Sequence, residues 1–195
     1  MTAPVKKRSQ DLESLIFETA LKLFTEKGYF NTSVHDIQKE ANVSIGSIYH
    51  YFKNKEAIAR AIYNNLIIHM EMAMVEIRNT HQTTQGRGRA VINYLFDLAE
   101  NAPDKMHYLL YATHKEFMPE EKSICSSPPF AIIREMINEG VEKGEIRNMD
   151  PVVASACLIG GALRIIRLDL DAFLEHPISH YLEEIWECSW ASIKK

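Results

Sequence analysis

Residues 41 to 58, ANVSIGSIYHYFKNKEAI, bring hydroxyl, imidazole and ammonium groups together in one short stretch. Tyr49 and His50 can donate hydrogen bonds, and Lys53 and Lys55 carry positive charge. Two kinds of site use such a set: a catalytic cleft with acid–base groups, or a surface that contacts the phosphates of a nucleic acid. The elements that position these side chains favour the second.

A helix over residues 12 to 27 is predicted ahead of this stretch. Apolar residues recur every three or four positions, as at Ile16, Ala20 and Phe24, which is typical of a helix with one buried face. Gly28 follows, and glycine readily takes the left-handed backbone that ends a helix. The first helix should therefore stop at Gly28.

Two short helices separated by a tight turn are predicted next. Ser33 and Asp36 have the spacing of a capping box, which starts a helix at residue 34. Asn42 tolerates a left-handed backbone, so the chain can turn there, and Ser44 can cap a third helix. Helix, turn and exposed short helix form the geometry of a helix-turn-helix. Asn54 then caps a long helix over residues 55 to 79.

The third helix should present a polar face to DNA. Ile48 and Phe52 lie four positions apart and face inward, so the small and polar residues between them face outward. For Tyr51 a core position and a surface position remain equally open. The lysines have a plain alternative as solvated charges. The predicted DNA contacts are Thr32, Ser33, His35, Ser44, Gly46, Ser47, Tyr49, His50, Tyr51, Lys53 and Lys55.

The distribution of charge supports a nucleic-acid partner although the formal net charge is −4. Residues 1 to 60 hold nine Lys/Arg against seven Asp/Glu, a net of +2, and the remaining residues hold 13 against 19, a net of −6. A basic first part on an acidic second part indicates two functions in one chain. We expect a DNA-binding domain over residues 1–54 and a second domain over residues 55–195.

The stretch from Ile16 to Ile58 resembles the DNA-binding domain of the TetR family of bacterial transcriptional regulators. The matching features include Gly28-Tyr29, Thr32-Ser33-Val34, Val43-Ser44, Gly46-Ser47-Ile48-Tyr49 and Tyr51-Phe52. Asn42 stands where the family commonly has glycine, and Ile48 where it commonly has leucine. The resemblance implies an all-helical homodimer of about nine helices, a variable C-terminal ligand-sensing domain and ligand-controlled release from a palindromic operator.

The rest of the chain also reads as helix, so the fold class expected is all-α. Helices are predicted at about 88–101, 103–114, 129–143 and 151–170, with a last one from about residue 177. The segment NTHQTTQGRGR is interpreted as a polar linker and EFMPEEKSICSSPPF as a long loop. Gly144 should end one helix, and Asp150-Pro151 should start the next.

Two further sets of residues are candidates for binding. Flexible methionines and aromatic residues could line an apolar pocket for a small-molecule effector, although any single one of them is more often plain core. These are Met70, Met74, Phe96, Tyr108, Tyr111, His114, Phe117 and Phe130. Helical spacing, together with a glycine pair that allows close approach of another helix, indicates a dimer face. Its predicted residues are Leu158, Gly160, Gly161, Leu163, Ile166, Leu182, Ile185, Trp186 and Trp190.

Several other kinds of site are not indicated. Cys125, Cys157 and Cys188 are odd in number and widely spaced, which favours neither a disulfide framework nor a thiolate zinc site. His176 and His180 are four apart but lack a firm third ligand, so no metal is predicted. No cofactor is expected. Without a run of about 18 apolar residues, we expect a cytoplasmic protein that does not span a membrane.

Three hypotheses for the function follow. The leading one is a ligand-responsive repressor that binds a pseudo-palindromic DNA operator as a homodimer. The second is a small-molecule carrier or enzyme that retains the helix-turn-helix, motivated by His107, Tyr111 and His114, although no nucleophile and base stand at a legible spacing. We therefore expect no enzyme. The third is a helical adaptor that binds proteins through its acidic part.

Overall fold

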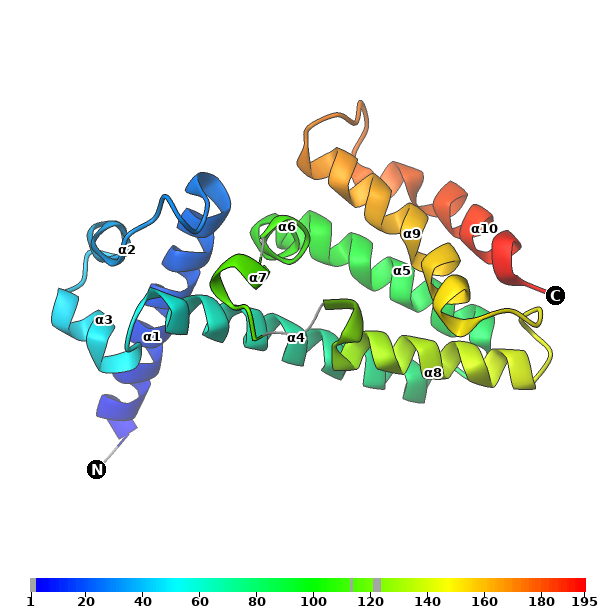
Figure 1. The fold of residues 1–195 in the computed structure, drawn as a ribbon, viewed down its shortest axis with the longest axis horizontal. Coiled ribbons are helices and arrows are strands. Elements are labelled where there is room, and N and C mark those ends of the chain that lie inside the picture. The colour runs from blue at the N-terminus through cyan, green and yellow to red at the C-terminus, as the bar shows by residue number, and fades with distance from the viewer. Residues whose placement is uncertain (1–2, 113, 121–123) are drawn as a thin grey trace. The chain divides into compact units, whose positions relative to one another are not determined.

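The computed structural model describes residues 3–112, 114–120 and 124–195. Most of these residues are in helices. The only β-type pairing among the described residues is an isolated bridge between Ile146 and Lys194 (Figure 1). The predicted all-α class is confirmed. The helices are α1 (Ala3–Lys27), α2 (Val34–Glu40), α3 (Ile45–Tyr51), α4 (Lys55–Thr80), α5 (Thr84–Asn101), α6 (Pro103–Tyr111), α7 (His114–Phe117), α8 (Pro128–Glu142), α9 (Pro151–Leu170) and α10 (Leu182–Ile193), with 3₁₀ turns η1 (Ile124–Ser126) and η2 (Ile178–Tyr181).

The chain forms two compact units. The first, here called the head unit, comprises Met1–Leu66 and His107–Glu121; the second, the body unit, comprises Ile67–Met106 and Lys122–Lys195. This grouping differs from a division after residue 54, because α6 and α7 pack with the head: the buried Tyr108 hydroxyl donates to the Ala59 carbonyl at 3.0 Å. The division at residue 54 into two functional domains stays a prediction.

Local signals in the head unit produce the elements that they predict. Gly28 has φ +83° and Asn42 has φ +51°, so both residues take the left-handed backbone on which the turns depend. The Ser33–Asp36 capping box is formed, and the Asn54 side chain accepts from the Ala57 amide at 2.8 Å. The inner faces of the helices meet in a core that includes fully buried residues: Ile16, Ala20, Ile37, Ile48 and Ile58.

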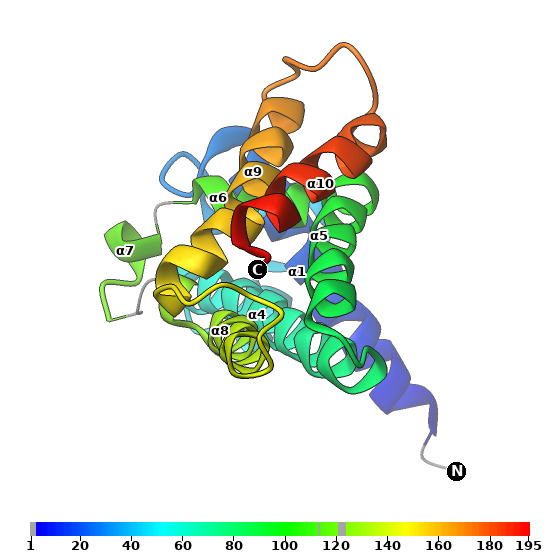
Figure 2. The same ribbon diagram turned by 90° about the vertical axis from the view of Figure 1, so that its right-hand side faces the viewer.

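In the body unit, α9 is the central helix and packs against α5, α8 and α10. Both views show α9 and α10 side by side (Figures 1 and 2). Gly144 has φ +72° and ends the turn after α8, as predicted, and the Asp150 side chain accepts from the Val152 amide at 2.8 Å to start α9. These boundaries are therefore set by local hydrogen bonds.

The interpretation of residues 79–89 as a linker is wrong over most of that range. Helix α5 begins at Thr84, since the Thr83 hydroxyl accepts from the Gly86 amide at 3.0 Å. Gly88 is buried, and a Cβ there would lie 3.3 Å from Leu158 Cδ1. The glycines therefore allow a helix to pack closely and do not mark flexible chain. The predicted loop at 116–130 likewise contains the end of α7, η1 and the start of α8, while residues 121–123 lie outside the described range.

Ion pairs between distant residues tie the body unit together. Glu139 of α8 accepts from Arg78 of α4 and from Arg87 of α5, each at 2.5 Å. Hydrogen bonding from Arg87, reinforced by Arg78, lowers the pKa of Glu139. Arg89 of α5 pairs with Glu183 of α10. The arginines of the QGRGR segment therefore connect α5 to α8 and to α10.

Helix α9 is long and apolar enough to cross a membrane by length and composition alone, with a mean hydropathy of 1.6 over its most apolar window. One such helix is weak evidence, since a core helix passes the same test. Here Ala154, Leu158, Ala162 and Ile166 are buried against neighbouring helices, which accounts for the apolar composition of this face.

Candidate nucleic-acid interface

Helix α3 presents the polar face that its sequence predicts. Ile48 is fully buried and Phe52 is 6% exposed, so this side of the helix holds it to the core. Gly46 and His50 on the other side are exposed, and Tyr49 is 53% exposed. A large aromatic side chain in solvent leaves apolar area uncovered, which a binding partner would bury.

The turn before α3 is held by hydrogen bonds within the motif. The Ser44 hydroxyl accepts from the Ser47 amide at 3.0 Å and lies 2.8 Å from the Ser47 hydroxyl. The Gln38 side chain donates to the Val43 carbonyl at 3.0 Å and so joins α2 to the turn. Because these bonds fix the start of α3, the exposed groups on its first turns have defined positions before DNA arrives.

The start of α2 offers further exposed groups. Ser33 and His35 are exposed, and the Ser33 hydroxyl already takes part in the capping box with Asp36. The hydrogen bonds from Ser33 lower the pKa of the Asp36 carboxyl. An ionised carboxylate at this point repels phosphate, so the N-terminus of α2 depends on its amides and His35 for any phosphate contact.

Tyr51, the last residue of α3, and Lys53 just after the helix differ in exposure. Lys53 is exposed and has the freedom to reach a phosphate. Tyr51 is half-buried, and its ring packs edge-on against His50 with the centroids 5.0 Å apart. The structure thus brings Ser44, Gly46, Ser47, Tyr49, His50 and Lys53 together on and around one helix.

Thr32 and Lys55 have different surroundings from the other predicted contacts. Thr32 is 1% exposed, and its hydroxyl donates to the carbonyls of Leu23 and Gly28. The Lys55 ammonium donates to the carbonyls of Tyr29 and Thr32, each at 2.9 Å, and lies 4.1 Å from the centre of the Tyr29 ring. We therefore propose that these two residues support the loop between α1 and α2 rather than bind DNA through their side chains.

Burial changes the pKa values of two side chains at this loop. Desolvation lowers the pKa of Lys55, although the nearby Glu56 carboxylate opposes the change. Desolvation, together with Glu56, raises the pKa of Tyr29. This arrangement could not be predicted from the sequence, because Lys55 and Tyr29 are 26 positions apart and neither belongs to a local capping pattern.

With this geometry established, comparison with known proteins identifies the chain. The model of the bacterial regulatory proteins of the tetR family matches residues 16–62, which include α2, α3 and the start of α4. Residues 16–62 of the chain therefore belong to the TetR family of bacterial regulatory proteins. Its matched segment contains every exposed group described above on α2 and α3. Catalytic chemistry is therefore not needed to explain the cluster of tyrosine, histidine and lysine side chains.

Relatives of this TetR-family protein are regulators with a helix-turn-helix. YhgD of Bacillus subtilis (strain 168), an HTH-type transcriptional regulator, is 28% identical over 190 residues, covering 87% of this chain and 88% of YhgD. The biofilm operon negative regulator IcaR of Staphylococcus epidermidis is 28% identical over 89 residues, 46% of this chain and 48% of IcaR. The HTH-type transcriptional regulator YuxN of Bacillus subtilis (strain 168) is 51% identical over 55 residues, which are 28% of this chain and 19% of YuxN.

A solved structure extends the similarity to nearly the whole fold. FadR of Bacillus subtilis, in complex with stearoyl-CoA, superposes with a TM-score of 0.80 and 22% identity, covering 92% of this chain and 98% of FadR. At this identity the match shows the shared all-helical architecture. The ligand named there belongs to FadR.

The predicted pocket residues fall in both units. Tyr108, Tyr111 and Phe117 line one pocket of the head unit. Met70, Met74, Phe96 and Phe130 lie in the body unit, where the first three are buried. His114 is in α7, but its side chain lies outside the described part of the structure. The roles of these eight residues remain predictions.

The predicted dimer residues separate into buried and accessible groups. Leu158, Ile166 and Trp186 are at most 6% exposed within the single chain, because α9 turns this face toward α5 and α10. They are therefore core residues of the single chain, and their place in a dimer face stays a prediction. Those still accessible are Gly160, Gly161, Leu163, Leu182, Ile185 and Trp190, the last of which stacks on Trp186 with centroids 5.7 Å apart.

Proposed function

We propose that this TetR-family protein represses transcription by binding a pseudo-palindromic operator as a homodimer and leaves the operator when a small-molecule effector binds. The observation that carries the DNA-binding part is α3, where Gly46, Tyr49 and His50 are exposed while Ser44 and Gln38 fix the turn before them. A helix held in this way can enter the major groove with its first turns against base edges.

The residues on and after α3 have different kinds of role in the proposed complex. Gly46 lets the backbone of α3 approach the DNA closely, and the Ser47 hydroxyl can donate to or accept from a base edge. Tyr49, His50 and Lys53 contact phosphates and fix the register of the helix. The role of Ser47 is specificity, and the role of Lys53 is affinity that depends on salt.

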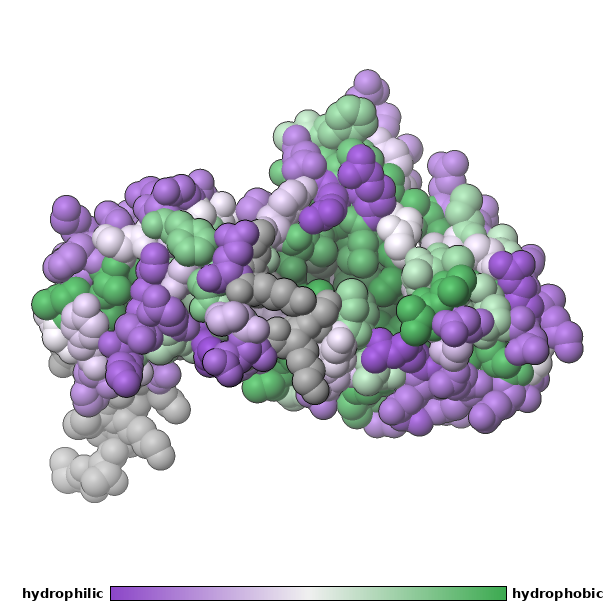
Figure 3. Space-filling model, viewed as in Figure 1, coloured by the Kyte–Doolittle hydropathy of each residue, from purple (hydrophilic) through white to green (hydrophobic). Residues whose placement is uncertain are grey.

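Dimerisation is proposed through the outer faces of α9 and α10. Gly160 is exposed, and a Cβ there would meet nothing within 4 Å, so this part of α9 is open to another helix. Val152 and Val153 on the same helix are 63% and 50% exposed. On the face shown in Figure 3, apolar residues gather over α9, whereas the surface over α8 is mainly hydrophilic. A second copy would bury this apolar surface and place two α3 helices on one duplex.

Repression and release are proposed from the relatives. IcaR is a negative regulator, and FadR has been seen with an acyl-CoA bound. For this chain we propose the sign of regulation and the mode of control but not the molecule. We assign no catalytic step to the protein, since its relatives are regulators, and we place it in the cytoplasm where the DNA is.

Selection of bound sequences from random duplex DNA, at two salt concentrations, tests the proposal. The purified protein should enrich an inverted repeat at both concentrations, with half-sites about one helical turn apart. Sedimentation of the protein on that duplex should give two chains per DNA. If no sequence is enriched and binding weakens as salt rises, the head unit binds DNA only through nonspecific phosphate contacts, and the proposal is overturned.

A further inference from the structure

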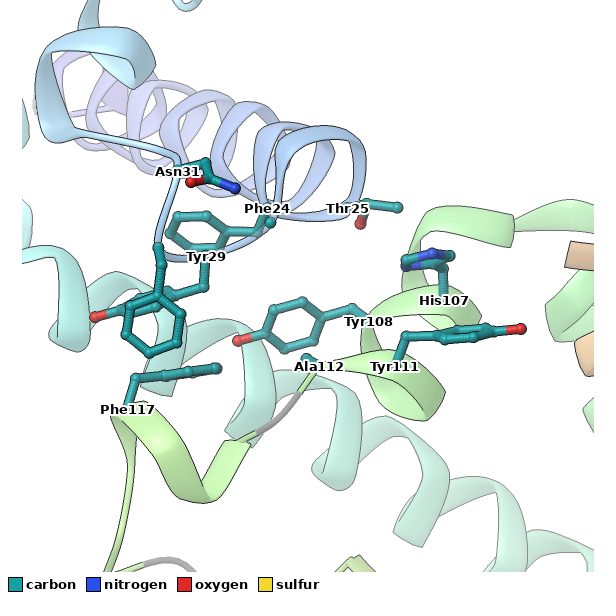
Figure 4. Close-up of a pocket in the computed structure, with 11 residues that line it drawn as sticks. Phe24, Thr25, Tyr29, Asn31, His107, Tyr108, Tyr111, Ala112 and Phe117 are labelled. Carbon is teal, nitrogen blue, oxygen red and sulfur yellow. The ribbon is translucent and has the colours of Figure 1, made fainter. Parts of the chain in front are cut away.

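A pocket of about 200 Å³ lies wholly inside the head unit, beside the helix-turn-helix. The end of α1 and the loop after it form one wall, and α6 with Phe117 of α7 forms the other (Figure 4). In Figure 4, Phe24 and Thr25 of α1 lie across from His107 and Tyr108 of α6. The lining residues are Phe24, Thr25, Gly28, Tyr29, Phe30, Asn31, His107, Tyr108, Tyr111, Ala112 and Phe117.

The lining selects the chemistry of a ligand. Among the residues that the structure describes, the lining includes no Asp, Glu, Lys or Arg, so an ion that enters would lose hydration without contacting an opposite charge among them. Aromatic rings dominate, and the rings of Tyr29 and Phe117 stack with centroids 3.9 Å apart. The lining residues with polar side-chain groups are Thr25, Asn31, His107 and the three tyrosines. A neutral aromatic molecule with a small polar substituent matches this combination.

The volume limits the ligand to about one ring. An apolar cavity of about 150 Å³ holds benzene. The pocket of about 200 Å³ therefore accommodates a single ring with one or two small substituents. A long acyl chain with a coenzyme A headgroup is far too large for it.

An exposed aromatic residue stands among the lining residues. Phe30 is 62% exposed, and its ring meets Tyr29 and Phe117 edge-on at centroid distances of 5.2 Å and 6.4 Å. A phenylalanine so exposed gains free energy when another apolar group covers it. A ring bound in the pocket would supply such a group.

One wall of the pocket also supports the DNA-binding helices. The loop residues Gly28 and Tyr29 line the pocket, and their carbonyls accept from Thr32 and Lys55 respectively. Thr32 directly precedes Ser33, which caps α2. A ligand that displaces this loop therefore acts on the start of α2 without any signal from the body unit.

We propose that this pocket is an effector site for a small neutral aromatic molecule, and that its occupation lowers affinity for the operator. The regulatory part rests on the proposed function, whereas the binding part does not. By linkage, operator DNA must weaken binding of the aromatic molecule by the same factor as the molecule weakens binding of DNA.

Calorimetric titration of the full-length protein with p-cresol and with p-toluate tests the binding part. The two probes share a methylated ring and differ in a neutral hydroxyl against a carboxylate. Cresol should bind and toluate should bind at least tenfold more weakly. Equal affinity for the two probes, or no heat from cresol, would overturn the proposed chemistry.

Two matched variants locate the site. The Thr25 and Thr80 hydroxyls each donate to the carbonyl four residues earlier, but Thr25 lines the pocket and Thr80 is exposed at the end of α4 in the body unit. Thr25→Leu should fill the pocket and weaken cresol binding at least tenfold, while Thr80→Leu should change it less than twofold. Loss of affinity in both variants, or in neither, would place the site elsewhere. Near-ultraviolet circular dichroism and thermal unfolding of each variant would show that it is folded.

Operator binding with and without cresol tests the regulatory part, using the duplex obtained by selection. Saturating cresol should weaken wild-type operator binding at least fivefold and leave Thr25→Leu unaffected. Cresol binding without any change in operator affinity would overturn the regulatory role while leaving the site in place. Failure to select any operator would instead count against the proposed function, and the calorimetric result would still stand.

Discussion

The helix-turn-helix of the head unit and the ion-pair network of the body unit depend on contacts of different range. In the head, Ser33 bonds to Asp36, Ser44 to Ser47, and Asn54 to Ala57, each across three positions. In the body, Arg78 and Arg87 reach Glu139 across 61 and 52 positions. Short-range bonds fix a helix-turn-helix while leaving its outer side chains available for DNA, whereas the body uses its polar side chains to hold helices together.

Two glycines test this difference most strongly. A Cβ on Gly140 of α8 would lie 2.6 Å from Thr84 Cγ2, whereas one on Gly46 of α3 would meet nothing closer than Ser44 Oγ at 3.8 Å. Gly140→Ala should cost about 3 kcal/mol of unfolding free energy through overpacking, and Gly46→Ala should cost none. Urea denaturation measures both. Equal stability of the two variants would contradict the close packing of α5 on α8.

Gly46→Ala also tests how closely the backbone of α3 approaches the operator DNA. The added methyl group stands on the exposed face of α3, so operator affinity should fall while stability is retained. Gel-shift titration with the selected operator measures this. Unchanged affinity would mean that the backbone near Gly46 does not approach the DNA closely.

Two lysines near the end of α3 distinguish a side chain that supports the loop between α1 and α2 from one proposed to contact DNA phosphates. Lys55→Met removes two hydrogen bonds from a charged donor, so it should cost about 2 kcal/mol of unfolding free energy. Lys53→Met should leave stability unchanged but lower the slope of log operator affinity against log salt by about one. The assignment fails if Lys55→Met is as stable as wild type, or if Lys53→Met keeps the full salt slope.

The ion pairs of the body predict a pH dependence. Because the pKa of Glu139 is lowered in the folded state, its contribution to stability is present above the ordinary pKa of about 4.5 and is lost as pH falls through the lower folded value. Arg87→Met should cost about 1 to 2 kcal/mol near neutral pH and reduce the loss of stability below about pH 4.5. Parallel stability curves for variant and wild type below that pH would contradict the pairing.

Two capping residues give the smallest effect and a direct comparison between the units. Ser44 caps α3 and Thr83 caps α5, each accepting from the amide three positions later at 3.0 Å. Ser44→Ala and Thr83→Ala should each cost about 1 kcal/mol in urea denaturation. Only Ser44→Ala should also weaken operator binding, since of these two helices we propose only α3 as a DNA contact. Equal loss of operator affinity in both variants would mean that the effect is general destabilisation.

The range of the contacts also explains what the sequence could predict. Gly28, Asn42, Ser44 and Asp150 mark boundaries through their own backbone or nearby amides, and those boundaries were predicted. The start of α5 was missed, because glycines at 86 and 88 are typical of a linker until Leu158, 70 positions later, packs against Gly88.

The candidate site follows the same rule. The exposed face of α3 could be predicted from helical periodicity and from the resemblance to the TetR family. The supporting role of Lys55 and the aromatic pocket could not. Lys55 of α4 contacts the loop after α1, and the pocket combines residues of α1, that loop, α6 and α7. Separating core from surface in α9 also required the packed structure, as Leu158 and Gly160 are only two positions apart.

The central claim is that α3 reads the operator sequence, and the specificity ratio tests it most directly. This ratio compares affinity for the selected operator with affinity for a scrambled duplex at one salt concentration, for wild type and for Ser47→Ala, which removes the hydroxyl proposed to contact a base edge. The ratio should fall at least tenfold in the variant while affinity for the scrambled duplex stays within about threefold. An unchanged ratio would show that the sequence is read by another part of the protein.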